Sequence, residues 1–135
     1  MRASQHNRQF ARFDVDIEVQ LAICDSCAEQ VAPINGNGTV GTWTATTAFP
    51  IARFGHTSVA YNGYLYVIGG NDGALSDVKV APINGDGTVG NWVTTTALAT
   101  PRAYHTSVAD NGYLYVIGGY DGAGNLDDVQ VARFE

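Results

Sequence analysis

One stretch of this sequence is written twice, and that duplication limits the possible folds more than any other feature. Residues 32–70 recur as residues 81–119, at an offset of 49 positions, with roughly 28 identities in 39 compared positions. Similarity at one fixed interval is the signature of a repeat architecture, in which each copy forms one supersecondary unit. The sequence therefore predicts a repeat protein.

Each copy contains a predicted β-hairpin. In the first copy, apolar runs at 57–61 and 64–68 flank the dipeptide Asn62-Gly63. Asn-Gly between two apolar runs is the strongest short hairpin signal, because a type I′ turn needs a positive φ angle at both central residues. The second copy repeats this pattern between residues 102 and 119. We therefore expect one hairpin in each repeat.

One full unit is predicted to hold four strands, at 57–61, 64–68, 77–83 and 91–95. Short strands joined by tight turns, at a period near fifty residues, are typical of a β-propeller blade. The His-Thr-Ser run, the Tyr-Leu-Tyr-Val-Ile-Gly-Gly strand and a later Trp closely resemble the kelch repeat. The resemblance covers about residues 31–134 and implies blades that assemble into a β-propeller.

The expected fold is all-β, with about two and a half four-stranded antiparallel blades of an incomplete, open propeller. Residues 31–46 would form a half blade, 53–95 a full blade and 102–134 a three-stranded partial blade. The pattern departs from the usual kelch repeat, because Val80 and Val131 stand where an aromatic residue is common. This departure looks like a bacterial form of the repeat.

An incomplete propeller predicts an uncovered face. The strand at 64–68 is apolar on both sides, as a strand between two adjacent blades should be. Two and a half blades leave at least one such face without a neighbour, and an uncovered apolar face favours association. Three interpretations stay open: a fragment of a longer propeller, a truncated product without a function of its own, or a homo-oligomer whose copies complete the ring.

Residues 1–30 do not match the repeat. Apolar and polar residues alternate from 13 to 23, which predicts one amphipathic strand. A turn at 24–27 would bring this strand against residues 29–34, so that it substitutes for a strand beside the first repeat. The alternative is a disordered leader that merely alternates.

That turn contains both cysteines of the chain, Cys24 and Cys27. A C-x-x-C pair can be a redox pair or half of a zinc site. A thioredoxin-like pair needs a βαβ context, and a structural zinc needs two further ligands, which His6, His56 and His105 do not supply at a suitable spacing. Two ordinary turn cysteines are the favoured interpretation.

The charge balance argues against two classes of partner. Thirteen acidic and seven basic side chains give a net charge of −6, whereas nucleic acids and anionic membrane surfaces attract basic patches. No apolar run approaches the length of a membrane span, and the polar N-terminal residues lack the apolar core of a signal peptide. The abundance of Thr, Gly and Asn is more typical of a secreted or cell-surface parent protein, so the compartment stays open.

The residues that recur in each copy are expected to be structural. Gly69-Gly70 and Gly118-Gly119 would let the backbone leave the second strand at angles that other residues avoid. His56 and His105 recur once per unit, as framework residues must and catalytic residues seldom do, and buried imidazoles require hydrogen-bond partners. Trp43 and Trp92 are expected to pack between blades, as large aromatic residues usually do.

The run around Asn84, Asp86 and Thr88 resembles part of a calcium loop, because it places oxygen donors at alternate positions. It lacks the Gly and the closing Glu of an EF-hand. Asn and Gly at a hairpin tip need no metal to explain them. We therefore expect neither a metal ion nor a cofactor.

Kelch domains generally bind partners at the end of the disc where the second-strand loops meet the entries into the first strands. The resemblance therefore implies a protein or carbohydrate ligand at that end. Aromatic residues and Arg are enriched in binding hot spots, although they are ordinary loop residues as well. The candidate contact residues are Arg53, Phe54, Asn71, Asp72, Arg102, Tyr104, Tyr120 and Asp121. For Arg53 and Arg102 the alternative is that the side chain reaches a neighbouring blade.

Some kelch-type propellers are enzymes, among them the copper-radical galactose oxidases and a sialic acid epimerase. The oxidase-type copper site needs Tyr, His and a cross-linked Cys from several blades, and both cysteines lie outside the repeats. No nucleophile, base and orienting group can be assembled from the spacing. The chain is expected to be a non-enzymatic binding module without catalytic residues. The alternative is a fragment of a galactose oxidase-like or epimerase-like enzyme whose catalytic residues lie in other blades.

Overall fold

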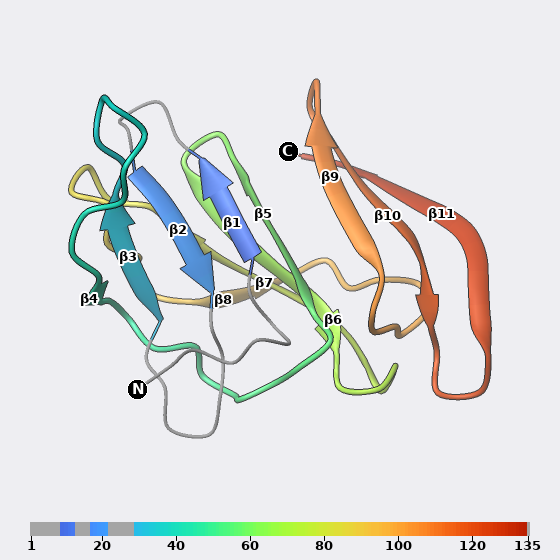
Figure 1. Ribbon diagram of the computed structural model, residues 1–135. Coiled ribbons are helices and arrows are strands. Elements are labelled where there is room, and N and C mark those ends of the chain that lie inside the picture. Colours follow the sequence, from blue (N-terminus) through green and yellow to red (C-terminus); the bar gives the residue numbers. More distant parts are fainter. Residues whose placement is uncertain (1–8, 13–16, 22–28, 135) are drawn as a thin grey trace.

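The computed structural model describes residues 9–12, 17–21 and 29–134, and their regular secondary structure is entirely β-strand (Figure 1). Within these ranges, no helix is long and apolar enough to cross a membrane. The strands are β1 (Gln9–Arg12), β2 (Ile17–Leu21), β3 (Gln30–Pro33), β4 (Thr44–Ala45), β5 (Thr57–Tyr61), β6 (Tyr64–Gly70), β7 (Leu75–Pro82), β8 (Val93–Thr95), β9 (Thr106–Asp110), β10 (Tyr113–Tyr120) and β11 (Asn125–Arg133).

The strands form three antiparallel sheets in chain order. Sheet 1 has the order β1-β2-β3-β4, sheet 2 the order β5-β6-β7-β8, and sheet 3 the order β11-β10-β9. The first strands of the sheets lie side by side, because β1 contacts β5 and β5 contacts β9. Successive meander sheets with neighbouring first strands are arranged as propeller blades, and the predicted all-β class is confirmed.

Sheet 1 combines strands from the non-repeat segment with strands from the first repeat. The strand expected over 13–23 overlaps β2, while residues 13–16 and 22–28 lie outside the described residues. β2 pairs antiparallel with β3, which is the pairing expected for a chain reversal across 24–27. Cys24 and Cys27 also lie outside the described residues. The half blade expected over 31–46 therefore shares one sheet with two strands from residues 1–30.

The two predicted hairpins form as expected. Asn62 and Gly63 have φ angles of 52° and 85°, and Asn111 and Gly112 have φ angles of 49° and 89°. Positive φ at both central residues is what a type I′ turn requires. The turns fix the register of β5 with β6 and of β9 with β10, in which Tyr61 opposes Tyr64 and Asp110 opposes Tyr113.

Two apolar clusters hold the sheets together, and β6 contributes to both. Between sheets 1 and 2, the buried residues are Val31, Leu65, Val67, Ala81 and Val89. Between sheets 2 and 3, they are Val59, Ile68, Val78, Leu114 and Val116. Because side chains alternate along a strand, Leu65 and Val67 face sheet 1 while Ile68 faces sheet 3. The predicted strand with two apolar faces is therefore sandwiched between two neighbouring sheets.

Sheet 3 has one covered face and one exposed apolar face. Leu114 and Val116 of β10 are buried against sheet 2. On the other side, Ile117 opposes Val129, and Tyr115 opposes both Val108 and Val131. Directly opposed residues share a face of a sheet, and these four aliphatic side chains are 43–58% exposed. We call Val108, Ile117, Val129 and Val131 the open face of sheet 3.

Candidate functional site

The candidate site is the surface formed where the two strand-connecting loops meet the entries into β5 and β9. We call it the loop face and define it by Phe54, Asn71, Asp72, Tyr104, Tyr120 and Asp121. The loops join β6 to β7 and β10 to β11. They touch through their backbones at Gly73, whose φ is 81° and where a Cβ atom would collide with residues 120–122. This close approach gives the loop face a continuous surface across sheets 2 and 3.

An exposed aromatic pair dominates the loop face. The side chains of Phe54 and Tyr104 are 40% and 58% exposed, and their ring centroids lie 6.5 Å apart at an interplanar angle of 49°. The Tyr104 hydroxyl donates a hydrogen bond of 3.0 Å to Asp72 Oδ1, which raises the pKa of Tyr104. The pair therefore joins residues from both sheets and couples an aromatic ring to a carboxylate.

Backbone hydrogen bonds fix the positions of these residues. Phe54 N donates to Asn71 Oδ1 at 3.0 Å, and Asn71 N donates back to Phe54 O at 2.6 Å. Tyr104 N donates to Gly55 O at 2.7 Å. Three non-glycine residues here, Asn71, Asp72 and Tyr104, have φ angles of 56–57°. Such left-handed conformations cost free energy and concentrate at functional sites.

Tyr120 and Asp121 shape the second loop. Tyr120 exchanges two backbone hydrogen bonds of 2.9 Å with Ala103, and its hydroxyl donates to Gly122 O at 3.1 Å. Asp121 Oδ1 accepts from the backbone N–H groups of Ala123 and Gly124, both at 2.9 Å, and these bonds lower the pKa of Asp121. Both residues therefore order their own loop as well as lining the loop face.

Arg53 and Arg102 lie beneath the loop face rather than on it. Their exposed fractions are 3% and 0%. Arg53 forms a two-pronged ion pair with Asp77 at 2.9 and 3.0 Å and donates to Gly69 O at 3.0 Å. Arg102 repeats this arrangement with Asp128 and Gly118 O. Hydrogen bonding to these arginines lowers the pKa of Asp77 and of Asp128.

This burial differs from the ligand-contact role that the sequence suggests for both arginines. A buried guanidinium that is paired with a carboxylate has no free donor fork to offer a ligand. Each pair instead ties the entry into a first strand to the third strand of the same sheet. We therefore assign Arg53 and Arg102 a structural role.

The two histidines occupy buried framework positions. His105 Nε2 lies 2.8 Å from Thr57 Oγ1, which also accepts a hydrogen bond of 2.6 Å from Ser107 Oγ. Burial, together with the nearby Arg102 charge, lowers the pKa of His105 to about 4. Burial first, and then the charge of Arg53, lowers the pKa of His56 to about 4 as well. Both rings are therefore neutral at physiological pH.

The other recurrent residues sit at tight backbone positions and between sheets. Gly69 and Gly70 have φ angles of 62° and 117°, and Gly118 and Gly119 have 63° and 102°. Trp92 packs edge-on against Phe49 at a centroid distance of 4.8 Å.

Trp43, by contrast, is 36% exposed. The first copy of the repeat therefore leaves on the surface an aromatic residue that the second copy packs against sheet 1.

The Asn-Gly-Asp-Gly-Thr run is an internally satisfied hairpin tip. Thr88 Oγ1 and Thr88 N both donate to Asp86 Oδ1, at 2.6 and 3.0 Å, and these bonds lower the pKa of Asp86. Asn84 Nδ2 donates to Thr88 Oγ1 at 2.9 Å. Side-chain hydrogen bonding to the turn accounts for these residue types. In the part of the chain that the structure describes, no three His, Cys, Asp or Glu residues are grouped so that they could hold a metal ion.

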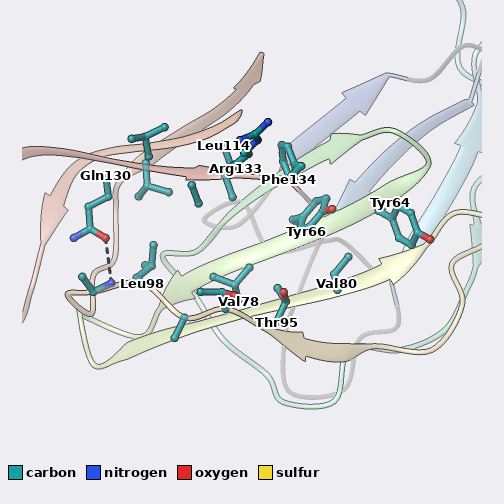
Figure 2. A pocket seen from close by; sticks show the side chains of 16 residues that line it. Tyr64, Tyr66, Val78, Val80, Thr95, Leu98, Leu114, Gln130, Arg133 and Phe134 are labelled. Carbon is teal, nitrogen blue, oxygen red and sulfur yellow. Dashed lines mark hydrogen bonds between the residues drawn. The ribbon is translucent and has the colours of Figure 1, made fainter. Parts of the chain in front are cut away.

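A cavity of about 620 Å³ lies between sheets 2 and 3, away from the loop face (Figure 2). Its walls come from β7, the segment 95–99, β10 and β11. Apolar residues dominate the walls, including Val78, Leu98 and Leu114, and Tyr66 and Phe134 stand at one end. The sequence gives no local signal for this cavity, because it depends on how two sheets are placed against each other.

Comparison with known families identifies two matched stretches. Residues 52–79 and 101–131 each match the Kelch motif. These stretches contain the two hairpins and the Arg–Asp pairs described above, so the resemblance expected from the sequence is confirmed. A search of curated proteins found no match to the chain.

Proposed function

We propose that this chain, a kelch-repeat protein by its two motif matches, is a non-enzymatic binding module that takes a protein or a glycan ligand on its loop face. Kelch modules commonly bind proteins, and the matched stretches supply the strands and loops that build this face. The observation that carries the proposal is the exposed aromatic pair of Phe54 and Tyr104, held on a rigid backbone beside Asp72.

The physical properties of the pair favour recognition. Exposed, pre-positioned aromatic rings contribute large contact areas at a small cost in conformational entropy. Asp72 adds a carboxylate that can accept hydrogen bonds from a sugar hydroxyl or a peptide N–H. The left-handed φ angles of Asn71, Asp72 and Tyr104 support the idea that this geometry serves binding.

The framework role of the histidines supports the non-enzymatic part of the proposal. Both imidazoles are buried, and their low pKa values keep them neutral between neighbouring sheets. A general base would need access to a substrate. A galactose oxidase-like or epimerase-like parent, with its catalytic residues in other blades, is the competing hypothesis.

The open face of sheet 3 supports a module that is completed by further sheets. The exposed Val and Ile side chains of this face occupy repeat positions whose counterparts on sheet 2 are buried by sheet 3. We propose that further blades, from a longer protein or from a second copy, cover this face.

The test compares ligand binding by the unaltered chain with binding by two loop-face variants, Phe54→Ala and Tyr104→Ala. A glycan array and a displayed peptide library serve as the two probes, and Val93→Ala, which alters an exposed residue of β8, is the control. We expect hits from one library whose affinity falls at least tenfold in both loop-face variants, as for hot-spot aromatics, but not in the control. Hits that all three variants bind equally, or no hit in either library, would contradict the proposal.

A further inference from the structure

The hairpin regions of the two repeats differ mainly at the loop face. Residues 53–73 and 102–122 differ at four positions, and three of these lie in the segments that form this face. The three pairs of differing residues are Phe54 and Ala103, Gly55 and Tyr104, and Asn71 and Tyr120. The arginines, histidines and glycine pairs of the framework are identical in both copies. The loop face is therefore the place where this chain departs most from its own repeat.

Two of these differences create the aromatic pair. Gly55 has a φ angle of 69°, and a Cβ atom added there would lie 3.1 Å from the Tyr104 ring and 3.1 Å from the Ala103 side chain. A larger residue at position 55 would therefore crowd the Tyr104 ring. Phe54 and Tyr104 each stand where the other copy has a small residue, Ala103 or Gly55. The pair is thus a feature of this combination of two repeats and not of the repeat itself.

A carboxylate lies beside the pair with one oxygen available. Asp72 is exposed, and its Oδ1 accepts the hydrogen bond of 3.0 Å from the Tyr104 hydroxyl. The other oxygen, Oδ2, has no hydrogen bond within the described part of the chain. Asp121 adds a second carboxylate on the loop that touches Gly73. The exposed groups of the loop face are therefore aromatic and acidic.

The basic side chains that the structure describes are engaged elsewhere. Arg53 and Arg102 are buried beneath the face, each in an ion pair with an aspartate. Lys79 donates to Thr94 Oγ1 at 2.8 Å in sheet 2, and Arg133 lies at the opposite end of sheet 3, where it opposes the first residue of β10. Among these described side chains, none brings an exposed positive charge to the loop face.

Aromatic rings beside a carboxylate attract a cation. A cation within about 6 Å of a ring centroid is held by the negative charge of the ring face, and one cation can satisfy this condition for two centroids that lie 6.5 Å apart. The hydrogen bond from the Tyr104 hydroxyl to Asp72 increases the electron density of the ring, which strengthens this attraction. A guanidinium can also stack on a ring while it donates to a carboxylate.

We propose that the loop face binds a protein partner through a basic side chain, arginine or lysine, that lies against Phe54 and Tyr104 and pairs with Asp72. This inference rests on the proposed function, because it narrows the ligand of the same surface to a positively charged protein segment. The net charge of −6 favours encounter with such a partner. The role of Asp72 is to neutralise the bound cation, and the role of the two rings is to hold it.

The test measures binding of short blocked peptides to the full chain by nuclear magnetic resonance. Each peptide has one central residue between glycines: arginine, lysine, or citrulline as the neutral isostere of arginine. Methyl glycosides are the carbohydrate probe. Asp72→Asn removes the carboxylate while keeping a residue that tolerates a left-handed φ angle. Asp110→Asn removes the same charge from an exposed residue at the tip of the β9–β10 hairpin, at the opposite end of the molecule (Figure 1), and is the matched control.

We expect the arginine and lysine peptides to shift the backbone resonances of Phe54, Asp72 and Tyr104. The citrulline peptide should bind about fivefold more weakly, or less, because it has no charge. Asp72→Asn should weaken binding of the arginine peptide by about fivefold, whereas Asp110→Asn should bind it as the unaltered chain does. Higher ionic strength should weaken the binding of both charged peptides, because the contact is exposed. The dispersion of the resonances checks that each variant is folded.

Equal binding of the arginine and citrulline peptides, or an equal effect of the two Asp→Asn substitutions, would overturn the proposal. Shifts of the same resonances by the glycosides and not by the charged peptides would also overturn it, while the proposed function would stand. If no probe shifts the loop-face resonances, this inference fails, and the array and library screen described above then decides the proposed function separately.

Discussion

Sheets 2 and 3 carry nearly the same residues in different surroundings. Val59, Ile68 and Val78 of sheet 2 are 8%, 0% and 4% exposed. Their counterparts Val108, Ile117 and Val129 in sheet 3 are 50%, 43% and 58% exposed. Sheet 3 covers the first set through Leu114 and Val116. The comparison teaches that repeat sequence specifies the sheet, whereas the neighbouring sheet decides whether a given residue contributes to the core.

The histidines show the same dependence on the neighbour. His105 reaches Thr57 of the preceding sheet, so its hydrogen bond crosses a junction between two repeats. Neither ring nitrogen of His56 has a hydrogen-bond partner in the described part of the chain. Sheet 1, which precedes His56, begins with strands that do not follow the repeat. The histidine between two matching units therefore gains a hydrogen bond through Nε2 that His56 lacks.

A large difference in stability between the sheets is expected from one glycine substitution made in each. An added Cβ at Gly69 would lie 2.5 Å from Arg102 O and 3.1 Å from His105 Cε1, both on the next unit. At Gly118 the nearest atom is Leu126 O at 3.3 Å. Since both glycines have nearly the same positive φ, they share a conformational cost of about 1–2 kcal/mol for alanine. The collision at Gly69 adds about 1–3 kcal/mol.

Chemical denaturation of Gly69→Ala and Gly118→Ala measures this pair. We expect the free energy of unfolding to fall by about 2–5 kcal/mol in the first variant and by about 1–2 kcal/mol in the second. Equal losses in the free energy of unfolding would mean that Arg102 and His105 do not pack closely against Gly69, and would contradict the structure.

A smaller effect is expected where the three sheets differ in residue type. Glu29, which directly precedes β3 of sheet 1, corresponds to Val78 and Val129. It is 1% exposed, and burial raises the pKa of Glu29 from 4.5 to about 8. The free energy of unfolding therefore has its full value with respect to this group below pH 4.5 and decreases as the pH rises toward 8. Over this range the carboxyl of Glu29 ionises in the unfolded chain but stays protonated in the folded one.

The variant Glu29→Val gives sheet 1 the residue of the other two sheets. We expect the free energy of unfolding at pH 7 to increase by about 1–4 kcal/mol, and its decline between pH 4.5 and 8 to become shallower. Val129→Glu, at the exposed equivalent position, should change stability by no more than about 0.5 kcal/mol. Unfolding curves across this pH range would contradict the account if Glu29→Val destabilised the chain at pH 7.

Local features of the fold could be predicted from the sequence. The Asn-Gly turns, the glycine pairs and the strand with two apolar faces depend on residues that lie close together in the chain, so periodicity and turn chemistry identify them. The four-strand unit and the kelch resemblance follow from the same patterns.

The features that could not be predicted depend on contacts between distant residues. Arg53 is buried because Asp77 and the carbonyl of Gly69 meet it across the sheet, and the loop position alone suggested exposure. Trp43 and Trp92 occupy the same position of the repeat but have different neighbours in space. The cavity likewise follows from the placement of whole sheets. The two residues of the aromatic pair could be predicted as contact residues, since Phe54 and Tyr104 both lie in the loops that enter the first strands and occupy adjacent positions of the repeat.

The most direct test of the account is the stability of Ile68→Ala and Ile117→Ala, measured at concentrations where the chain is monomeric. The two isoleucines are the same residue of two repeats, and they are 0% and 43% exposed. The account predicts a loss of about 2–5 kcal/mol for Ile68→Ala and a change within about 0.5 kcal/mol for Ile117→Ala. Similar losses for the two variants would show that the open face of sheet 3 is covered within a single chain, and would contradict the arrangement of sheets described above.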